Sequence, residues 1–146
     1  MRRISIEGVL VGGIVDLVFS FFLRFAISSY EFAKISQMAK DRVASTFPQI
    51  LSLHTGHLAI GLCCSILGGY VAARIAGHDE LLNGAASAFL RVLFGLPPVV
   101  FGLFARGLGM DLNLEWVHLL LLVAAPALGL LGGYLRLRQT RRLQPA

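Results

Sequence analysis

Charged residues are scarce in this 146-residue sequence: 14% of its residues are Asp, Glu, Lys or Arg, whereas 56% are hydrophobic. The mean hydropathy is positive. A chain this short could not hide so much apolar surface from water in a compact soluble fold. The composition therefore excludes an ordinary soluble domain and indicates that lipid solvates part of the chain.

The sequence also lacks the common motifs of catalysis and cofactor binding. Its two cysteines, Cys63 and Cys64, are adjacent, which excludes a CxxC redox pair and a disulfide framework. No GxxxxGKS or GxxxxGKT phosphate loop and no GxSxG nucleophile elbow is present. We therefore expect no catalytic residue and predict a non-enzymatic protein.

Long apolar segments are what the sequence does contain, and there are four of them, at residues 4–27, 51–76, 81–105 and 114–135. A helix that rises 1.5 Å per residue needs about 20 apolar residues to cross a hydrocarbon layer of about 30 Å. The sequence therefore predicts an all-α membrane protein, with a single membrane domain over residues 1–146. It has four transmembrane helices and a basic tail at residues 136–146.

The connection between the first two segments, residues 28–47, carries apolar side chains at helical spacing among charged ones. This pattern is typical of an amphipathic helix that lies in the membrane interface. We expect a short interfacial helix here, separate from the first span.

Four spans place both termini on the same side of the membrane, and the Lys and Arg residues indicate which side. The side that holds the termini and the turn at residues 77–80 carries Arg2, Arg3, Arg74, Arg136, Arg138, Arg141 and Arg142. The opposite side carries Arg24, Lys34, Lys40, Arg42 and Arg106. The more basic side is normally cytoplasmic, so we predict that both termini are cytoplasmic. Because these charges lie at segment ends, we expect a lipid bilayer and no nucleic acid as partner.

An internal repeat relates the second and fourth segments. A shift of 64 positions aligns Leu67-Gly68-Gly69-Tyr70 with Leu131-Gly132-Gly133-Tyr134, and Arg74 with Arg138. We interpret this as a duplicated helical hairpin. Two hairpins in the same orientation would form a parallel repeat, a class that occurs in transporters and also in inert bundles.

Two opposite charges are expected near the middle of the membrane, Asp16 in the first segment and Arg91 in the third. A single charge at that depth costs about 2.5–3.5 kcal/mol, and such residues usually face the bundle interior and find a partner. We predict that Asp16 and Arg91 form an intramembrane ion pair. The pair would either set the register of two helices or belong to an ion or proton pathway.

A possible metal site lies near the opposite membrane surface. His54 and His57 form an i, i+3 pair at the start of the second segment, and Glu115 and His118 form another at the start of the fourth. Imidazole and carboxylate groups bind Zn, Fe and haem iron. The alternative is that these side chains are polar anchors at the interface. The sequence therefore leaves three possibilities for the cofactor: none, a metal ion or haem.

Glycine forms stripes along the predicted helices. Small residues allow two helix backbones to approach closely in lipid, where packing replaces the hydrophobic effect. We therefore expect helix contacts, within one copy or between copies, at Gly12, Gly13, Gly68, Gly69, Tyr70, Gly132, Gly133 and Tyr134.

The phrases GVLVGGIVDLVFSF and LGGYVAARIAG, with the following Asn83-Gly84, resemble small four-span bacterial inner-membrane proteins that have no established activity. The resemblance implies a location in the bacterial cytoplasmic membrane. The main functional hypothesis is a non-enzymatic helix bundle that self-associates or serves as an accessory subunit of a larger membrane complex. The alternatives are a small oligomeric transporter or channel that uses Asp16 and Arg91, and a metal- or haem-binding subunit that uses His54, His57 and His118.

Overall fold

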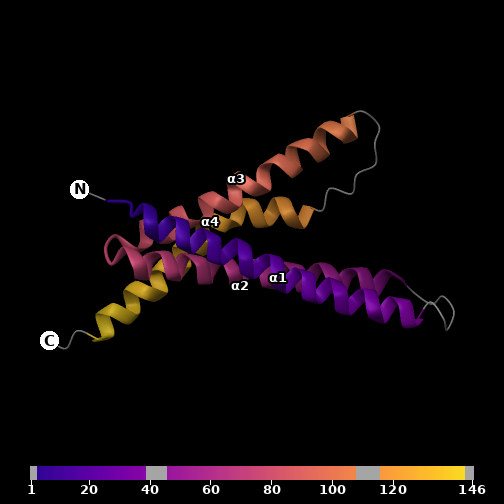
Figure 1. Ribbon diagram of the computed structural model, residues 1–146, viewed down its shortest axis with the longest axis horizontal. Coiled ribbons are helices and arrows are strands. Elements are labelled where there is room, and N and C mark those ends of the chain that lie inside the picture. Colours follow the sequence, from indigo (N-terminus) through magenta and orange to yellow (C-terminus); the bar gives the residue numbers. More distant parts are fainter. Residues whose placement is uncertain (1–2, 39–45, 108–115, 144–146) are drawn as a thin grey trace.

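The computed structural model describes residues 3–38, 46–107 and 116–143, and within these ranges the secondary structure is entirely helical (Figure 1). The four helices are α1 (Ile6–Met38), α2 (Thr46–Ala76), α3 (Glu80–Gly107) and α4 (Trp116–Leu143). Each contains all or most of one of the four apolar segments. The all-α class that the sequence predicts is confirmed for the described ranges.

Two helices extend further than hydropathy alone indicated. The sequence placed the end of the first span near residue 27, followed by a separate interfacial helix at residues 28–47, but α1 continues without a break to Met38. Neither glycine nor proline lies between Ile27 and Met38, so nothing in the backbone ends the helix there. Residues 39–45 of the expected interfacial segment lie outside the described residues. In the same way α4 continues to Leu143, so the basic tail begins as helix.

Three stretches of the described chain are long and apolar enough to cross a membrane: Ile6–Tyr30 in α1, Leu58–Ala76 in α2 and Leu119–Arg142 in α4. Their apolar side chains lie mostly on the outside of the molecule, where Phe21, Phe22 and Val123 are strongly exposed. This distribution is the reverse of a soluble core and fits a molecule that is solvated by lipid.

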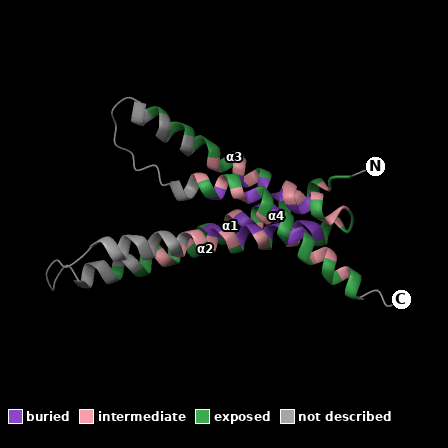
Figure 2. Ribbon diagram, turned by 180° about the vertical axis from the view of Figure 1, so that it is seen from behind, coloured by how far each residue is buried: buried purple, intermediate pink, exposed green. Residues whose placement is uncertain are grey.

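The helices pack around α2. It contacts α1, α3 and α4, and α3 contacts α1 and α4, whereas α1 and α4 do not touch within the described ranges. All four helices converge near the N-terminus and the turn between α2 and α3, and the α1–α2 and α3–α4 pairs diverge from there (Figure 1). The buried residues are concentrated in the convergent region (Figure 2).

The turn between α2 and α3 is built around glycine and a buried asparagine. Gly77 adopts a φ of 65°, and its N–H donates to the carbonyl of Ala73, which ends α2. Asn83, whose side chain is 0% exposed, donates from Nδ2 to the carbonyls of His78 and Asp79. Its Oδ1 accepts a hydrogen bond of 2.7 Å from the backbone N–H of Ser5. One side chain therefore joins the start of α1 to the start of α3.

Candidate functional site

The structure brings together the two opposite charges that the sequence paired. Asp16 of α1 is 2% exposed and Arg91 of α3 is 8% exposed. Arg91 Nη2 lies 2.6 Å from Asp16 Oδ1, which is the distance of a charge-assisted hydrogen bond. The two charges therefore neutralise each other inside the bundle.

Two serines extend the ion pair into a network. Ser20, one helical turn after Asp16, donates to Asp16 Oδ1 at 3.3 Å and accepts a hydrogen bond from Arg91 Nη2. Ser65 of α2 donates to Asp16 Oδ2, also at 3.3 Å. Both carboxylate oxygens are thus hydrogen-bonded, and the network joins three helices. Buried polar networks that are satisfied in this way specify one arrangement of the helices.

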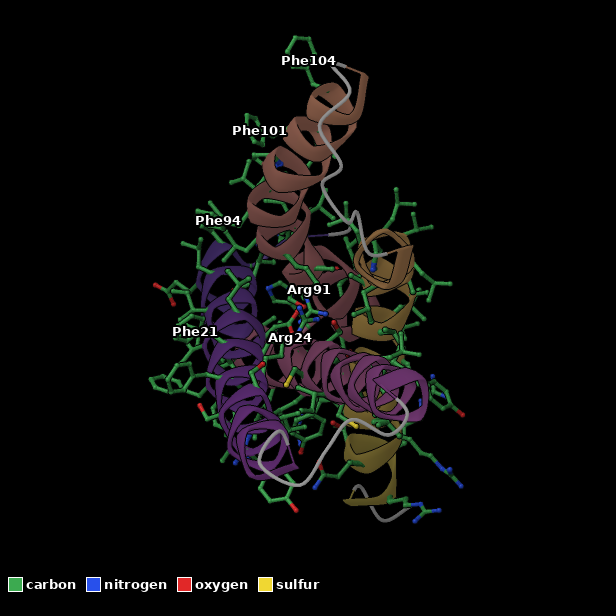
Figure 3. All side chains as sticks on the ribbon, turned by 90° about the vertical axis from the view of Figure 1, so that its right-hand side faces the viewer. Phe21, Arg24, Arg91, Phe94, Phe101 and Phe104 are labelled. Carbon is green, nitrogen blue, oxygen red and sulfur yellow. The ribbon has the colours of Figure 1, made fainter. Side chains whose placement is uncertain are left out.

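Arg91 also binds the backbone of α2. Its Nη1 donates to the carbonyl of Gly61 at 3.1 Å. A second guanidinium lies beside this glycine, because a Cβ placed on Gly61 would be 3.2 Å from Arg24 Nη2. The sequence analysis placed Arg24 at the membrane surface opposite the termini, but its side chain reaches from α1 toward the interior (Figure 3). It can do so because helical side chains point toward the N-terminus of their helix.

Close contact between α1 and α2 positions Asp16. A Cβ added to Gly12 would lie 2.5 Å from the carbonyl oxygen of Gly68 and 2.6 Å from Cβ of Ala72. A Cβ on Gly68 would lie 2.8 Å from that of Asp16 itself. Only glycine at these two positions lets the backbones come near enough for Asp16 to reach Ser65 on α2.

Gly13, the next residue, allows an equally close contact between α1 and α3. A Cβ on Gly13 would lie 2.6 Å from Leu90 Cδ1 and 2.9 Å from the carbonyl oxygen of Ser87. Leu90 precedes Arg91, so this contact brings the arginine against α1. Gly12 and Gly13 therefore face two different helices, which places Asp16 at the junction of α1, α2 and α3.

The remaining glycines pack α4 against α2 and α3. A Cβ on Gly69 would overlap the backbone of Gly129, and one on Gly132 would overlap the carbonyl oxygen of Ile66. A Cβ on Gly133 would overlap the carbonyl oxygen of Glu80 in α3. The predicted glycine contacts are therefore made within a single copy of the chain.

The two Gly-Gly pairs of the predicted repeat do not make equivalent contacts. In α2 the first glycine, Gly68, faces the helix of its own hairpin, α1, and the second, Gly69, faces α4. In α4 the order is reversed, because Gly132 faces α2 and Gly133 faces α3 of its own hairpin. An exact parallel repeat would give the same order in both hairpins.

The two tyrosines of the repeat, Tyr70 and Tyr134, also differ in their contacts and exposure. The hydroxyl of Tyr70 donates to Oε1 of Gln139 and so joins α2 to α4. Tyr134, predicted as a packing residue within one copy or between copies, is 46% exposed, so it is not enclosed within this copy. It lies on the outer side of α4, one position after Gly133, and a step of 100° around the helix moves it away from the interface.

The predicted metal ligands, Glu115 and the side chains of His54, His57 and His118, lie outside the described residues. Among the residues that the structure does describe, no three His, Cys, Asp or Glu side chains are placed to hold a metal ion.

Sequence reasoning gave no role to the three buried polar residues that help to join helices, Ser20, Ser65 and Asn83. For Ser20 a signal existed, since its i, i+4 spacing from Asp16 places both on one helix face. For Ser65 and Asn83 the only signal was a polar residue within an apolar segment. Neither the rotation of the helices nor their partners can be read from such a position.

No protein-family model, no curated protein and no solved structure matches this chain. Its function must therefore be inferred from the site itself.

Proposed function

We propose that this chain is a non-enzymatic membrane helix bundle that crosses the bilayer four times and acts by self-association or as an accessory subunit of a larger membrane complex. The proposed location is the bacterial cytoplasmic membrane, with both termini on the cytoplasmic side. Three described stretches of sufficient length and hydropathy support it. In the proposal α3 is the fourth span, and the pairing of Arg91 with Asp16 removes the main cost of its insertion.

The observation that carries the proposal is the closed network around Asp16. Its carboxylate oxygens accept hydrogen bonds from Arg91, Ser20 and Ser65, and Arg91 donates in addition to Gly61. A carboxylate that carries protons must change its partner in each cycle. Here it is held by a guanidinium and two hydroxyls from three helices, so the network favours a role in setting helix register.

The surface supports association with other membrane proteins. The predicted glycines already pack against helices of the same copy. A contact with another copy or with a partner would therefore be made by the large apolar side chains on the outer surface. Phe21 on α1 and Phe94, Phe101 and Phe104 on α3 point away from the bundle (Figure 3). Aromatic side chains dominate the energetics of interfaces.

A small oligomeric transporter is the second candidate, and one observation favours it. Arg24 and Arg91 both lie next to Gly61, so two guanidinium groups reach the same part of the interior, close to Asp16. Arginine side chains that line a membrane pore are a feature of anion pathways. Transport would require the Asp16–Arg91 bond to open.

Substitution of Asp16 by Asn separates the two candidates. Protein reconstituted in liposomes is assayed for solute-driven proton movement and, in detergent, for its unfolding temperature. The bundle proposal expects no proton movement in the original protein and a lower unfolding temperature for Asp16→Asn. Glu7→Gln, an exposed acid on the same helix, serves as the matched control and should leave the unfolding temperature unchanged. Proton movement that Asp16→Asn abolishes without loss of stability would refute the bundle proposal in favour of transport.

A further inference from the structure

The C-terminal part of α4 carries an outward basic face. Arg138, Arg141 and Arg142 are exposed, and in Figure 1 the C-terminal end of α4 extends beyond the other three helices. None of the three makes a hydrogen bond or an ion pair with a residue that the structure describes. We call these three residues the arginine face.

No acidic residue of the same two helices compensates this charge. Neither α2 nor α4 contains Asp or Glu, and α2 adds the exposed Arg74 near its C-terminus. Arg136 is different from its neighbours, because it is half-buried and its Nη1 donates to Gln139. Gln139 in turn accepts from Tyr70, which holds this end of α4 against α2.

The arginine face continues the apolar surface of α4. Leu130, Leu131, Tyr134 and Leu135 are exposed, and they lie on the same side of the helix as Arg138 at spacings of three, four, seven and eight residues. Along one face the helix therefore passes from leucine to tyrosine to arginine. This is the order in which a membrane passes from hydrocarbon through the interface to the phosphates.

The distances match the layers of a bilayer. At 1.5 Å per residue, Arg138 lies about 6 Å and Arg142 about 12 Å beyond Tyr134 along the helix axis. The headgroup layer on each side of the hydrocarbon is roughly 5–8 Å thick. With Tyr134 at the hydrocarbon boundary, the arginine face lies at and just beyond the depth of the lipid phosphates.

We propose that the arginine face binds the headgroups of anionic phospholipids in the leaflet that contains the C-terminus. The charge complementarity and the continuity with the lipid-facing leucines select a lipid over a soluble anion or a protein partner. Guanidinium groups bind phosphate oxygens through two parallel hydrogen bonds, which suits three arginines on adjacent turns. The inference rests on the proposed membrane bundle, since it needs α4 to cross the bilayer.

Quenching of a single tryptophan by brominated lipids tests the inference. The only tryptophan of the chain, Trp116, is replaced by Phe, and Tyr134→Trp places a new one beside the arginine face. The protein is reconstituted into vesicles that contain brominated phosphatidylglycerol or brominated phosphatidylcholine. We expect a preference for phosphatidylglycerol of at least about fivefold, because one arginine near a membrane surface contributes roughly that factor.

The combined variant Arg138→Gln, Arg141→Gln, Arg142→Gln should reduce this preference to about onefold. The matched control, Arg136→Gln on the same helix, should retain it, since that side chain is already bonded to Gln139. Undiminished quenching by brominated phosphatidylcholine shows that the combined variant is still folded and inserted.

Three results would overturn the inference while leaving the bundle intact. The first is equal quenching by the two lipids when all three arginines are present. The second is a preference for phosphatidylglycerol that survives in the combined variant. The third is loss of that preference when inorganic phosphate is added but not when sulfate is added at equal ionic strength. Absence of quenching by either lipid would instead show that α4 does not enter the bilayer, which overturns the bundle proposal itself.

Discussion

Replacement of Arg91 by Ala should strongly destabilise the bundle. It removes the charged partner of Asp16 at 2.6 Å and leaves the two serine hydroxyls at 3.3 Å as hydrogen-bond donors to the carboxylate. Removal of one member of a buried ion pair costs about 3–5 kcal/mol in soluble proteins. Hydrogen bonds between membrane helices are weaker, at about 0.6 kcal/mol on average. Because the carboxylate loses the guanidinium that is hydrogen-bonded to it, we expect a loss of about 3 kcal/mol in the free energy of unfolding.

The double substitution makes the prediction specific to the pair. Asp16→Ala alone leaves Arg91 bonded to Gly61 and Ser20, so we expect a smaller loss of about 2 kcal/mol. The double variant removes both members of the pair and should lose about 2 kcal/mol, less than Arg91→Ala alone. The coupling energy is then about 3 kcal/mol, at the upper end of the range for residues that share a network.

The cycle is measured by equilibrium unfolding in one detergent for the original protein, the two single variants and the double variant. Glu7→Ala combined with Arg138→Ala is the control cycle, since both residues are exposed and should give additive effects. If the losses of Asp16→Ala and Arg91→Ala add to within about 0.5 kcal/mol, the two side chains do not interact and the network is wrong.

Two further substitutions, one of them with a matched control, test how the helices are held. Gly69→Ala should destabilise the bundle by about 1–3 kcal/mol, since the added Cβ would lie 2.6 Å from Gly129 Cα and neither backbone can move away. The control is Gly56→Ala, whose added Cβ would lie 3.7 Å from its nearest neighbour, Ile27 Cδ1. It should be neutral or stabilising by up to about 1 kcal/mol. Thermal unfolding checks both, and equal melting of the two variants would contradict the close contact of α2 and α4. Asn83→Ala should cost about 1–3 kcal/mol and speed hydrogen exchange at the Ser5 amide, which loses its acceptor. Unchanged protection of Ser5 would show that another group caps the start of α1.

Local sequence features predicted the helices and the central charge pair well. Asp16 and Arg91 were paired because both were expected at the same depth, where an isolated charge is too costly to leave unpartnered. The boundaries were less predictable, as α1 shows by continuing beyond its apolar segment to Met38. Hydropathy reports where lipid ends, whereas a helix ends only where its backbone hydrogen bonding is interrupted.

Long apolar helices could be predicted from the residues alone, because length and hydropathy are sums over neighbouring residues. The packing of the folded molecule decided that Ser20 and Ser65 complete the network and that Tyr134 lies outside. It also decided that Gly68 and Gly132, which match in the repeat, face α1 and α2 respectively. These outcomes depend on how each helix is rotated about its axis and which helices cross it. Rotation is set by the packing of all four helices together, and no single segment contains that information.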